Sequence, residues 1–371
     1  MRRFGRFGAV AAAALVVVVL GAACSSNKGG TGSSAGGFSG TALTGAGATF
    51  PAPIYDKWFH DFLSVESAAR INYQAIGSGG GVTQFTSGTV DFGASDAPLK
   101  DEEIAAIKAK GREVVQIPTV LGGVVIAYNV SGLQSGLKLD GKTAADIFLG
   151  KIRSWNDPAI AQQNSGVSLP PEPIQVVHRS DESGTTKVFT SWLSKESPEW
   201  ESKVGADKAV QWPVGTGGDG NDGVAAGITQ TEGAVGYLSF DFAVSSGLGI
   251  ADIKRDSDGQ YVTPSVDSIS AAGGVLKFPI SSDTNILNSS APGAYPISTT
   301  TYLLINPAWT DKGKGQTMVD FLYWALTKGQ DMTQSVNYSP LPDLIRQQTL
   351  SLLSQIQYQG KTIEPSPAVK R

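Results

Sequence analysis

Short apolar runs alternate with amphipathic stretches along most of the chain, which is the pattern of alternating strands and helices. Apolar runs bounded by turn residues predict strands at 70–76, 90–94, 174–178 and 295–305, and two strands joined at Gly122 and Gly123 within 113–129. Helices are expected from residue 82, at 101–110, at 185–195 and over most of 316–357. Stretches rich in Gly and Pro predict loops at 164–173 and 213–223. The alternation indicates an α/β protein with largely parallel sheets.

The first 24 residues have the layout of a secretory signal. Three arginines within residues 1–6 precede an apolar run from Ala9 to Leu20, and small residues follow up to Cys24. This run is shorter than the ~20 residues that a membrane-spanning helix needs. Residues 20–24 (LGAAC) resemble the bacterial lipobox, in which the cysteine becomes the lipidated first residue. We therefore expect a signal peptide over 1–23 and palmitate-type lipidation of Cys24; the alternative is an ordinary signal peptide with a chance cysteine.

The composition of the chain after the signal indicates a flexible tether followed by a folded part with a small negative net charge. Residues 24–40 are mostly small and polar, typical of a flexible tether, so the folded part should begin near Thr41. The 371 residues, 41% of them hydrophobic, suffice for about two domains. The net charge is −4, and it becomes −7 without the three arginines of the signal, which argues against nucleic acid as the main partner. One cysteine and two histidines exclude an internal disulfide and a zinc site of Cys and His ligands.

Three turns rich in Gly, Ser and Thr lie between a predicted strand and a predicted helix start. They are at 45–50 (GAGATF), 77–81 (GSGGG) and 181–186 (DESGTT). A helix N-terminus presents unpaired N–H groups and a partial positive charge, so it can bind an anion. The alternative is that each Ser or Thr only caps its helix. Three such turns in one chain favour a shared anion site.

Two charged residues stand at predicted strand ends near these turns. Arg179 could form a bidentate pair with an oxyanion, or it could be a surface residue paired with Asp181. Asp96 could cap the helix that begins near Pro98, or it could face the ligand. A carboxylate accepts a hydrogen bond only from a ligand that carries a proton, which phosphate does near neutral pH and sulfate does not.

Nine short motifs, taken in order, carry a resemblance to a known family. They are GAGATFPAP (45–53), IGSGGG (76–81), VDFGASDAPL (90–99), PTVLGGVV (118–125), LDGKT (139–143), HRSDESGTT (178–186), GNDGVAA (220–226), GAVGYL (233–238) and PISTTTYLLI (296–305). Together they resemble the phosphate-binding lipoproteins of bacterial phosphate ABC transporters over about residues 41–345.

The resemblance implies a periplasmic-binding-protein fold, type II-like, with two α/β lobes joined by two hinge strands. Lobe I would comprise 41–128 and 296–371, and lobe II would comprise 129–295. The chain would cross between the lobes near Tyr128–Asn129 and Tyr295–Pro296. Phosphate would lie in the cleft between them.

The resemblance also implies a non-enzymatic receptor, lipid-anchored on the extracytoplasmic face of the cell membrane. It would capture inorganic phosphate and deliver it to the ABC permease for import, without a cofactor or a metal. The alternatives are a binding protein for another tetrahedral oxyanion such as sulfate, and a phosphohydrolase that uses the same pocket.

Carried over motif by motif, the resemblance implies one set of phosphate contacts. They are Ala48, Thr49, Phe50, Ser78, Asp96, Arg179, Ser183, Gly184 and Thr185. Asp96 would accept the phosphate proton, Arg179 would pair with both the oxyanion and Asp181, and the others would supply backbone and hydroxyl donors. Glu182 departs from the family pattern, in which many members have Gly, and we expect its side chain to point to solvent.

Other patterns point to enzymes but fit poorly. Residues 136–143 match the P-loop pattern, yet two Leu and an Asp make a poor phosphate cradle. Residues 215–220 match GxGxxG beside two acids and are interpreted as a loop, and the GxSxG match at 32–36 lies in the tether. His178 and Ser183 lie on one strand-to-turn segment, which supplies no orienting acid for a catalytic triad.

Overall fold

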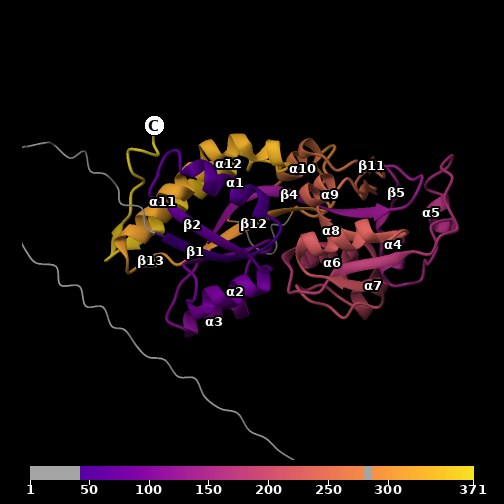
Figure 1. Ribbon diagram of the computed structural model, residues 1–371, viewed down its shortest axis with the longest axis horizontal. Coiled ribbons are helices and arrows are strands. Elements are labelled where there is room, and N and C mark those ends of the chain that lie inside the picture. The colour runs from indigo at the N-terminus through magenta and orange to yellow at the C-terminus, as the bar shows by residue number, and fades with distance from the viewer. Residues whose placement is uncertain (1–41, 280–285) are drawn as a thin grey trace, which may run out of the picture. The chain divides into compact units, whose positions relative to one another are not determined.

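The computed structural model describes residues 42–279 and 286–371, and in them nine strands form one sheet (Figure 1). The strand order is β2-β1-β3-β12-β4-β8-β6-β7, with β9 beside β4. The strands are β1 (Ala42–Gly47), β2 (Arg70–Ala75), β3 (Phe92–Ser95), β4 (Val115–Asn129), β6 (Gln175–Arg179), β7 (Thr216–Gly218), β8 (Ala234–Ser239), β9 (Gly249–Ile250) and β12 (Ser298–Ile305). The signal, Cys24 and the tether lie outside the described residues.

β4 is one continuous strand of 15 residues, so the prediction of two strands joined at Gly122 and Gly123 is wrong. Its first part, up to Gly123, pairs with β12, and its second part, from Val124, pairs with β8. The two glycines serve packing rather than a turn. A Cβ at Gly122 would lie 2.3 Å from the ring of Phe50, and a Cβ at Gly123 would lie 2.9 Å from Ile269.

Strand directions in this sheet are mixed. β1 runs parallel to β2 and β3, and β6 runs parallel to β7 and β8, but β4 and β12 pair antiparallel with their neighbours. The expectation of largely parallel sheets therefore holds for the outer strands and fails for the two central ones. The carboxyl ends of β1, β3 and β6 lead directly into the turns that contain Thr49, Asp96 and Asp181.

Five helices begin close to the carboxyl ends of the strands that precede them, β1, β2, β3, β6 and β7. They are α1 (Ala52–Phe62), α2 (Ser78–Ser87), α3 (Asp101–Ala109), α6 (Gly184–Glu196) and α8 (Gly220–Gln230). α2 begins at Ser78 rather than at the predicted Val82, because its glycines belong to the first turn. A Cβ at Gly81 would lie 2.4 Å from the Cα of Gly47, so this turn packs directly on the end of β1.

The remaining elements complete the two halves around the central strands. The helices are α4 (Gly141–Phe148), α5 (Pro158–Ala161), α7 (Pro198–Lys203), α9 (Phe240–Ser245), α10 (Val266–Gly273), α11 (Lys312–Leu326), α12 (Asp343–Leu352), and the 3-10 helices η2 (Lys328–Val336) and η3 (Leu353–Gln355). Two small sheets have the orders β11-β10-β5 and β13-β14-β15. Their strands are β5 (Lys138–Leu139), β10 (Asp252–Lys254), β11 (Tyr261–Val262), β13 (Ala308–Trp309), β14 (Gln357–Tyr358) and β15 (Lys361–Thr362).

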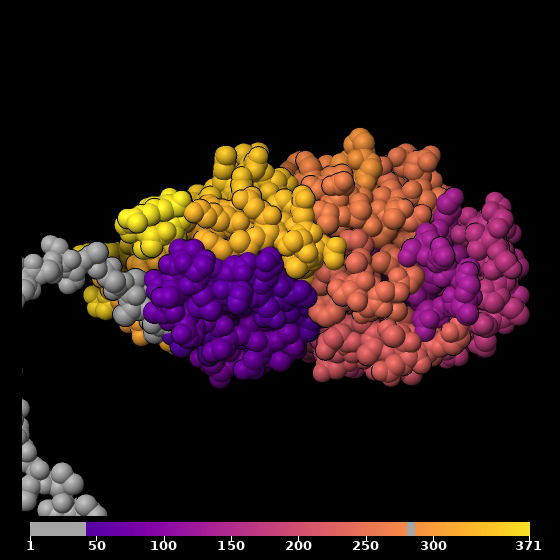
Figure 2. Space-filling view, turned by 45° about the horizontal axis from the view of Figure 1, so that its top comes forward, coloured from indigo at the N-terminus to yellow at the C-terminus, as the bar shows by residue number. Residues whose placement is uncertain are grey.

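Segments far apart in the sequence share each half. Figure 1 shows β1, β2 and α1 grouped with the C-terminal helices α11 and α12, and α4, α6, α7 and α8 grouped in the other half. In Figure 2 the indigo and yellow atoms adjoin in the same way. α1 contributes Trp58 and Phe62, both fully buried, and the ring of Phe62 lies 5.6 Å from that of Phe321 in α11. Within the residues that the structure describes, no helix is both long and apolar enough to cross a membrane.

Candidate anion-binding site

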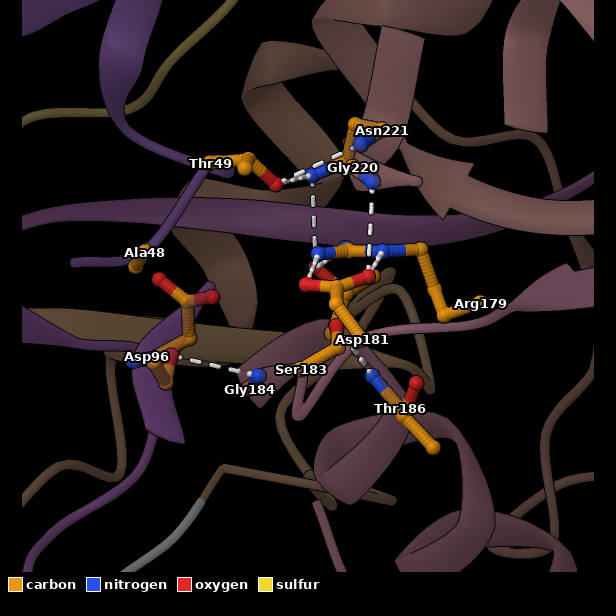
Figure 3. Close-up of polar contacts among 12 residues, drawn as sticks. Ala48, Thr49, Asp96, Arg179, Asp181, Ser183, Gly184, Thr186, Gly220 and Asn221 are labelled. Atoms are coloured by element: carbon orange, nitrogen blue, oxygen red, sulfur yellow. Dashed lines mark hydrogen bonds and ion pairs between the residues drawn. The ribbon is translucent and has the colours of Figure 1, made fainter. Parts of the chain in front are cut away.

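The residues singled out from the sequence come together where the two halves of the sheet meet (Figure 3). Residues 48–50 follow β1, Ser78 opens α2, Asp96 follows β3, Arg179 ends β6, and residues 183–185 form the start of α6. All the polar side chains among them are buried: Thr49, Ser78, Asp96, Arg179, Ser183 and Thr185. The structure therefore buries these polar side chains where the five segments meet.

Ser78 links two of the turns directly. Its Oγ accepts hydrogen bonds from the N–H of Asp96 at 3.2 Å and from the N–H of Gly184 at 3.1 Å. A side chain at position 184 would clash with this arrangement, because its Cβ would lie 2.4 Å from the Ser78 Oγ and 2.7 Å from an oxygen of Asp96. Glycine at this position thus allows the start of α6 to approach Asp96.

Arg179 supplies a positive charge that is buried and held in a fixed orientation. Its Nε donates to Asp181 Oδ1 at 2.7 Å, and its Nη2 donates to Asp181 Oδ2 at 2.5 Å. Its Nη1 also donates to Thr185 Oγ1 at 3.3 Å. The pairing with Asp181 is as expected, but Arg179 is only 3% exposed, so it is not a surface residue. A guanidinium has five N–H groups, so two remain for a ligand.

Asp96 is a buried carboxyl facing the same region. Thr301 in β12 donates a hydrogen bond to its Oδ1 at 2.9 Å. Burial raises the pKa of Asp96 to about 7, and this rise is opposed by the Thr301 hydrogen bond and by the charge of Arg179. The alternative that Asp96 caps a helix is wrong, because α3 begins only at Asp101.

The capping alternative holds for one of the three turns. Ser183 Oγ accepts from the N–H of Thr186 at 3.1 Å and so caps α6. The first turns of α1 and α2 have no side-chain cap. At these two starts, however, the N–H of Ala52 donates to the carbonyl of Thr49 at 3.2 Å and the N–H of Gly79 donates to the carbonyl of Glu182 at 2.9 Å, so both groups already have protein acceptors.

The backbone N–H groups in the turn after β1 differ in whether they have an acceptor within the protein. The N–H of Ala48 donates to the carbonyl of Ala94 at 3.1 Å and extends the β1–β3 pairing. The N–H groups of Thr49 and Phe50 have no protein acceptor within the described part of the chain. The expectation of a backbone donor is therefore best supported at Thr49 and Phe50, since the Ala48 N–H is already engaged.

Asn221, at the start of α8, belongs to the site but was missed by the sequence analysis. Its Nδ2 donates to Thr49 Oγ1 at 2.8 Å and to Thr185 Oγ1 at 3.4 Å, and its Oδ1 accepts from the N–H of Ser239 at 3.0 Å. The preceding Gly220 donates its N–H to Asp181 at 3.3 Å. The available signal was the Gly-rich segment 215–220, which forms β7 and leads into α8 rather than a plain loop.

Glu182 is exposed, as expected, but it also touches the opposite turn. Its carbonyl accepts from the N–H of Gly79 at 2.9 Å. A Cβ at Gly79 would lie 2.3 Å from the Glu182 Cβ, so only glycine leaves room for this contact.

The competing motifs do not form sites. In the P-loop match, Asp140 Oδ1 accepts from the N–H of Thr143 at 2.8 Å, so a carboxylate occupies the start of α4 where a phosphate would need to lie. His178 stacks on Trp212 with ring centroids 4.9 Å apart, and its Nδ1 lies 3.0 Å from the carbonyl of Arg179 rather than near Ser183. Among residues 42–279 and 286–371, no group of three or more His, Cys, Asp or Glu is placed to hold a metal ion.

Comparison with known proteins identifies the family. The model of the PBP superfamily domain matches residues 30–328. A phosphate-binding protein PstS from Pasteurella multocida is 39% identical over 323 residues, which cover 86% of this chain and 90% of that protein. The chain belongs to the PstS family of the PBP superfamily. Members of the PstS family are named as binding proteins, so this chain is a receptor and not an enzyme.

Two solved structures that resemble this PstS family member show that it has the PBP fold. One is a high-affinity periplasmic phosphate-binding protein (PfluDING) bound with phosphate, with a TM-score of 0.68, 21% identity, and coverage of 87% of this chain and 96% of that chain. The other is a putative phosphate ABC transporter substrate-binding protein with bound phosphate from Clostridium perfringens. It has a TM-score of 0.59, 19% identity, and coverage of 81% of this chain and 100% of that chain. The α/β periplasmic-binding-protein fold expected from the sequence is thus confirmed.

Replacing Asn221 by alanine should destabilise the ligand-free protein. The change leaves the buried N–H of Ser239 without its acceptor, which costs about 1–3 kcal/mol of unfolding free energy. Urea denaturation measures this loss. Thr229→Ala, on an exposed turn of the same helix, is the control and should stay within about 0.5 kcal/mol of the wild type. Equal losses in the two variants would show that the Asn221 side chain does not hold α8 to β8.

Proposed function

We propose that this chain binds inorganic phosphate in the buried region between the two halves and delivers it to an ABC permease for import. The proposed contacts are Ala48, Thr49, Phe50, Ser78, Asp96, Arg179, Ser183, Gly184 and Thr185. The observation that carries the proposal is a buried carboxyl, Asp96, set among hydrogen-bond donors and one oriented guanidinium. A site for an unprotonated anion has no use for that carboxyl, whereas a site for phosphate does.

Each part of the site has a distinct role in this proposal. Arg179 neutralises charge on the oxyanion, and Asp181 fixes the plane of its guanidinium. The uncapped starts of α1 and α2 would contribute a partial positive charge, and the N–H groups of Thr49 and Phe50, just before α1, would donate to the ligand. The Ser78 hydroxyl accepts from the N–H groups of Asp96 and Gly184 and hydrogen-bonds to the Asp96 carboxyl, so it would hold that carboxyl in place beside the ligand.

Asp96 would select phosphate over sulfate. As a carboxylate it accepts a short charge-assisted hydrogen bond from the protonated phosphate oxygen. Sulfate offers only unprotonated oxygens, so it meets like charge at close range. A site built around one hydrogen bond can reject an analogue that lacks it by about 10⁴-fold or more.

Capture and release would follow from opening and closing of two lobes, 41–128 with 296–371 and 129–295. In support, β4 exchanges β12 for β8 as its partner between Gly123 and Val124, so the chain passes through both halves within one strand. Hydrogen bonds between the halves converge on the site, from Asn221 to Thr49 and from Gly184 to Ser78. The hinges near Tyr128–Asn129 and Tyr295–Pro296 stay predictions from the sequence.

The receptor would be held at the extracytoplasmic face of the cell membrane by a lipid on Cys24, with residues 24–40 as its tether. Support comes from the lipobox-like sequence LGAAC at 20–24. A tether of this composition lets the folded part move between the medium and a permease in the same membrane. The solved substrate-binding protein from Clostridium perfringens is named as part of a phosphate ABC transporter, which supports a permease as partner.

Arg179→Ala should weaken phosphate binding by roughly 1.5–3 kcal/mol, the range for hydrogen bonds to charged groups. Isothermal titration calorimetry with inorganic phosphate measures the change, beside a ligand-free thermal melt that reports on folding. Arg346→Ala removes the same charge from a surface pair with Asp343 and should leave the dissociation constant unchanged. An unaltered dissociation constant in Arg179→Ala would remove Arg179 from the site.

Asp96→Asn should make sulfate binding measurable while lowering phosphate affinity only modestly. The amide removes the negative charge and offers an N–H donor to sulfate, yet it keeps a carbonyl that can accept the phosphate proton. Competition calorimetry with both anions at fixed pH and ionic strength tests this. If the variant excludes sulfate as strongly as the wild type, selectivity resides in other groups.

The wild type and the Asp96→Asn variant should also differ in pH dependence. The pKa of Asp96 is raised to about 7, so the carboxyl gains its proton as the pH falls through this value. A protonated Asp96 can donate to sulfate, and wild-type sulfate affinity should therefore rise below about pH 7 and fall above it. The side-chain amide of the variant does not titrate, so its sulfate affinity should be flat over this range. A flat profile in the wild type would contradict a contact between Asp96 and the anion.

Cys24→Ala should move the protein from the membrane fraction to the soluble fraction, because the only cysteine in the chain is the proposed lipid acceptor. Fractionation of cells expressing each form, followed by immunoblotting, measures the distribution. Ser25→Ala, next to the cysteine, is the matched control and should stay with the membrane. Retention of Cys24→Ala in the membrane fraction to the wild-type extent would rule out the anchor.

A further inference from the structure

A second set of contacts joins the two halves outside the proposed phosphate contacts. Lys208 Nζ donates to Glu103 Oε1 in α3, and Lys100 Nζ donates to Asp207 Oδ2 at 2.9 Å. Glu103 and Lys100 belong to the N-terminal part of the chain, whereas Asp207 and Lys208 lie between α7 and β7. These four residues are called the clasp below. Both of its ion pairs cross from one half to the other, with opposite polarity.

The two pairs differ in burial. The side chains of Lys208 and Glu103 are 8% and 19% exposed, and those of Lys100 and Asp207 are 37% and 46% exposed. A partly buried pair is screened much less by salt than an exposed one. Removal of one partner from such a pair leaves the other charge poorly solvated, which is costly. The Lys208–Glu103 pair is therefore the stronger element of the clasp.

The clasp is connected to the site on both sides. The carbonyl of Lys208 accepts from the N–H of Ser183, the residue that caps α6. Glu103 also accepts from the N–H of Lys100 at 2.8 Å and so fixes the start of α3. Lys100 lines a cavity of about 510 Å³ that reaches Asp96 and Thr299, so one member of the clasp borders the same cavity as Asp96.

We propose that the clasp determines how long phosphate stays bound, by holding the two lobes together over the occupied site. The proposal rests on the proposed function, since it needs phosphate as ligand and lobes that separate. When the lobes part, all four charged groups become hydrated and the clasp contributes nothing. Its free energy therefore belongs to the closed state alone, and it acts on release more than on capture.

The net charge of the protein and the clasp predict opposite effects of the Glu103→Gln substitution on phosphate binding. Removing a negative charge from an acidic protein favours an anionic ligand everywhere on its surface. Glu103→Gln would then bind phosphate more tightly. If Glu103 instead acts through Lys208, the same substitution accelerates phosphate release. Glutamine still accepts from the N–H of Lys100, so the start of α3 is preserved.

The experiment measures the dissociation rate of phosphate by stopped-flow fluorescence with a phosphate-scavenging chase, in full-length mature protein. Lys208→Met should release phosphate about tenfold faster or more, and Glu103→Gln should release it about threefold faster. Glu113→Gln removes an identical charge from an exposed position of the same half and should match the wild type. Ligand-free melting temperatures should be equal in all four proteins, because the clasp is open without phosphate.

The second ion pair allows a rescue that does not touch Lys208. Lys100→Glu places two acids opposite each other and should accelerate release. Adding Asp207→Lys restores an ion pair with reversed polarity and should return the rate toward the wild type. Such recovery requires that the two residues meet in the bound state.

The outcomes are distinct. Failure of the wild type to bind inorganic phosphate would overturn the proposed function itself. Phosphate binding with wild-type release rates in Lys208→Met and Glu103→Gln would overturn the clasp alone. Lowered ligand-free melting temperatures with unchanged release would show that these residues serve folding, which also overturns the proposal. Slower release in Glu103→Gln would show that general electrostatics prevails.

Discussion

The buried pair of Arg179 and Asp181 is the interaction on which the site depends. A guanidinium that is 3% exposed would be costly without a partner, and Asp181 meets this need with both of its oxygens. The same carboxylate accepts from the N–H of Gly220, so it ties the end of β6 to the start of α8. Through α8 it positions Asn221, and through Arg179 it opposes the rise in the pKa of Asp96. One charge pair thus sets both the geometry and the electrostatics of the region.

Much of the fold could be predicted where the signal is local. Hydrophobic periodicity and flanking turn residues predict the strand at 70–76 and the helices at 101–110 and 185–195. The structure has these elements within a few residues of the predicted bounds. The errors share a different cause. The local sequence at Gly122 and Gly123 indicates a turn, but both glycines lie within a strand. Side chains at these positions would clash with Phe50 and Ile269, which pack against the strand there. The antiparallel direction of β12 is likewise fixed by strands that lie far back in the sequence.

The site could be predicted where strand ends and helix starts carry it. Arg179 and Ser183 stand in such a motif, and the structure places both in the buried region. Asn221 was missed because its partners, Thr49, Thr185 and Ser239, come from three other segments. Local reasoning also allowed Asp96 to be a helix cap, but α3 begins only at Asp101, and the Asp96 side chain accepts from Thr301, which is 205 residues away in the sequence.

The pairing of β12 with β3 and β4 constrains the order in which the molecule can fold. Thr299 donates to the carbonyl of Asp96 and Thr301 donates to its carboxyl, across sequence separations of 203 and 205 residues. Until the ribosome has made β12, β3 and the first part of β4 lack their shared neighbour and keep an open strand edge. Contacts of such long range slow folding. The first half of the sheet therefore cannot be completed until most of the chain has been synthesised. Until then the nascent polypeptide stays partly unfolded, and its exposed strand edges can be bound by chaperones.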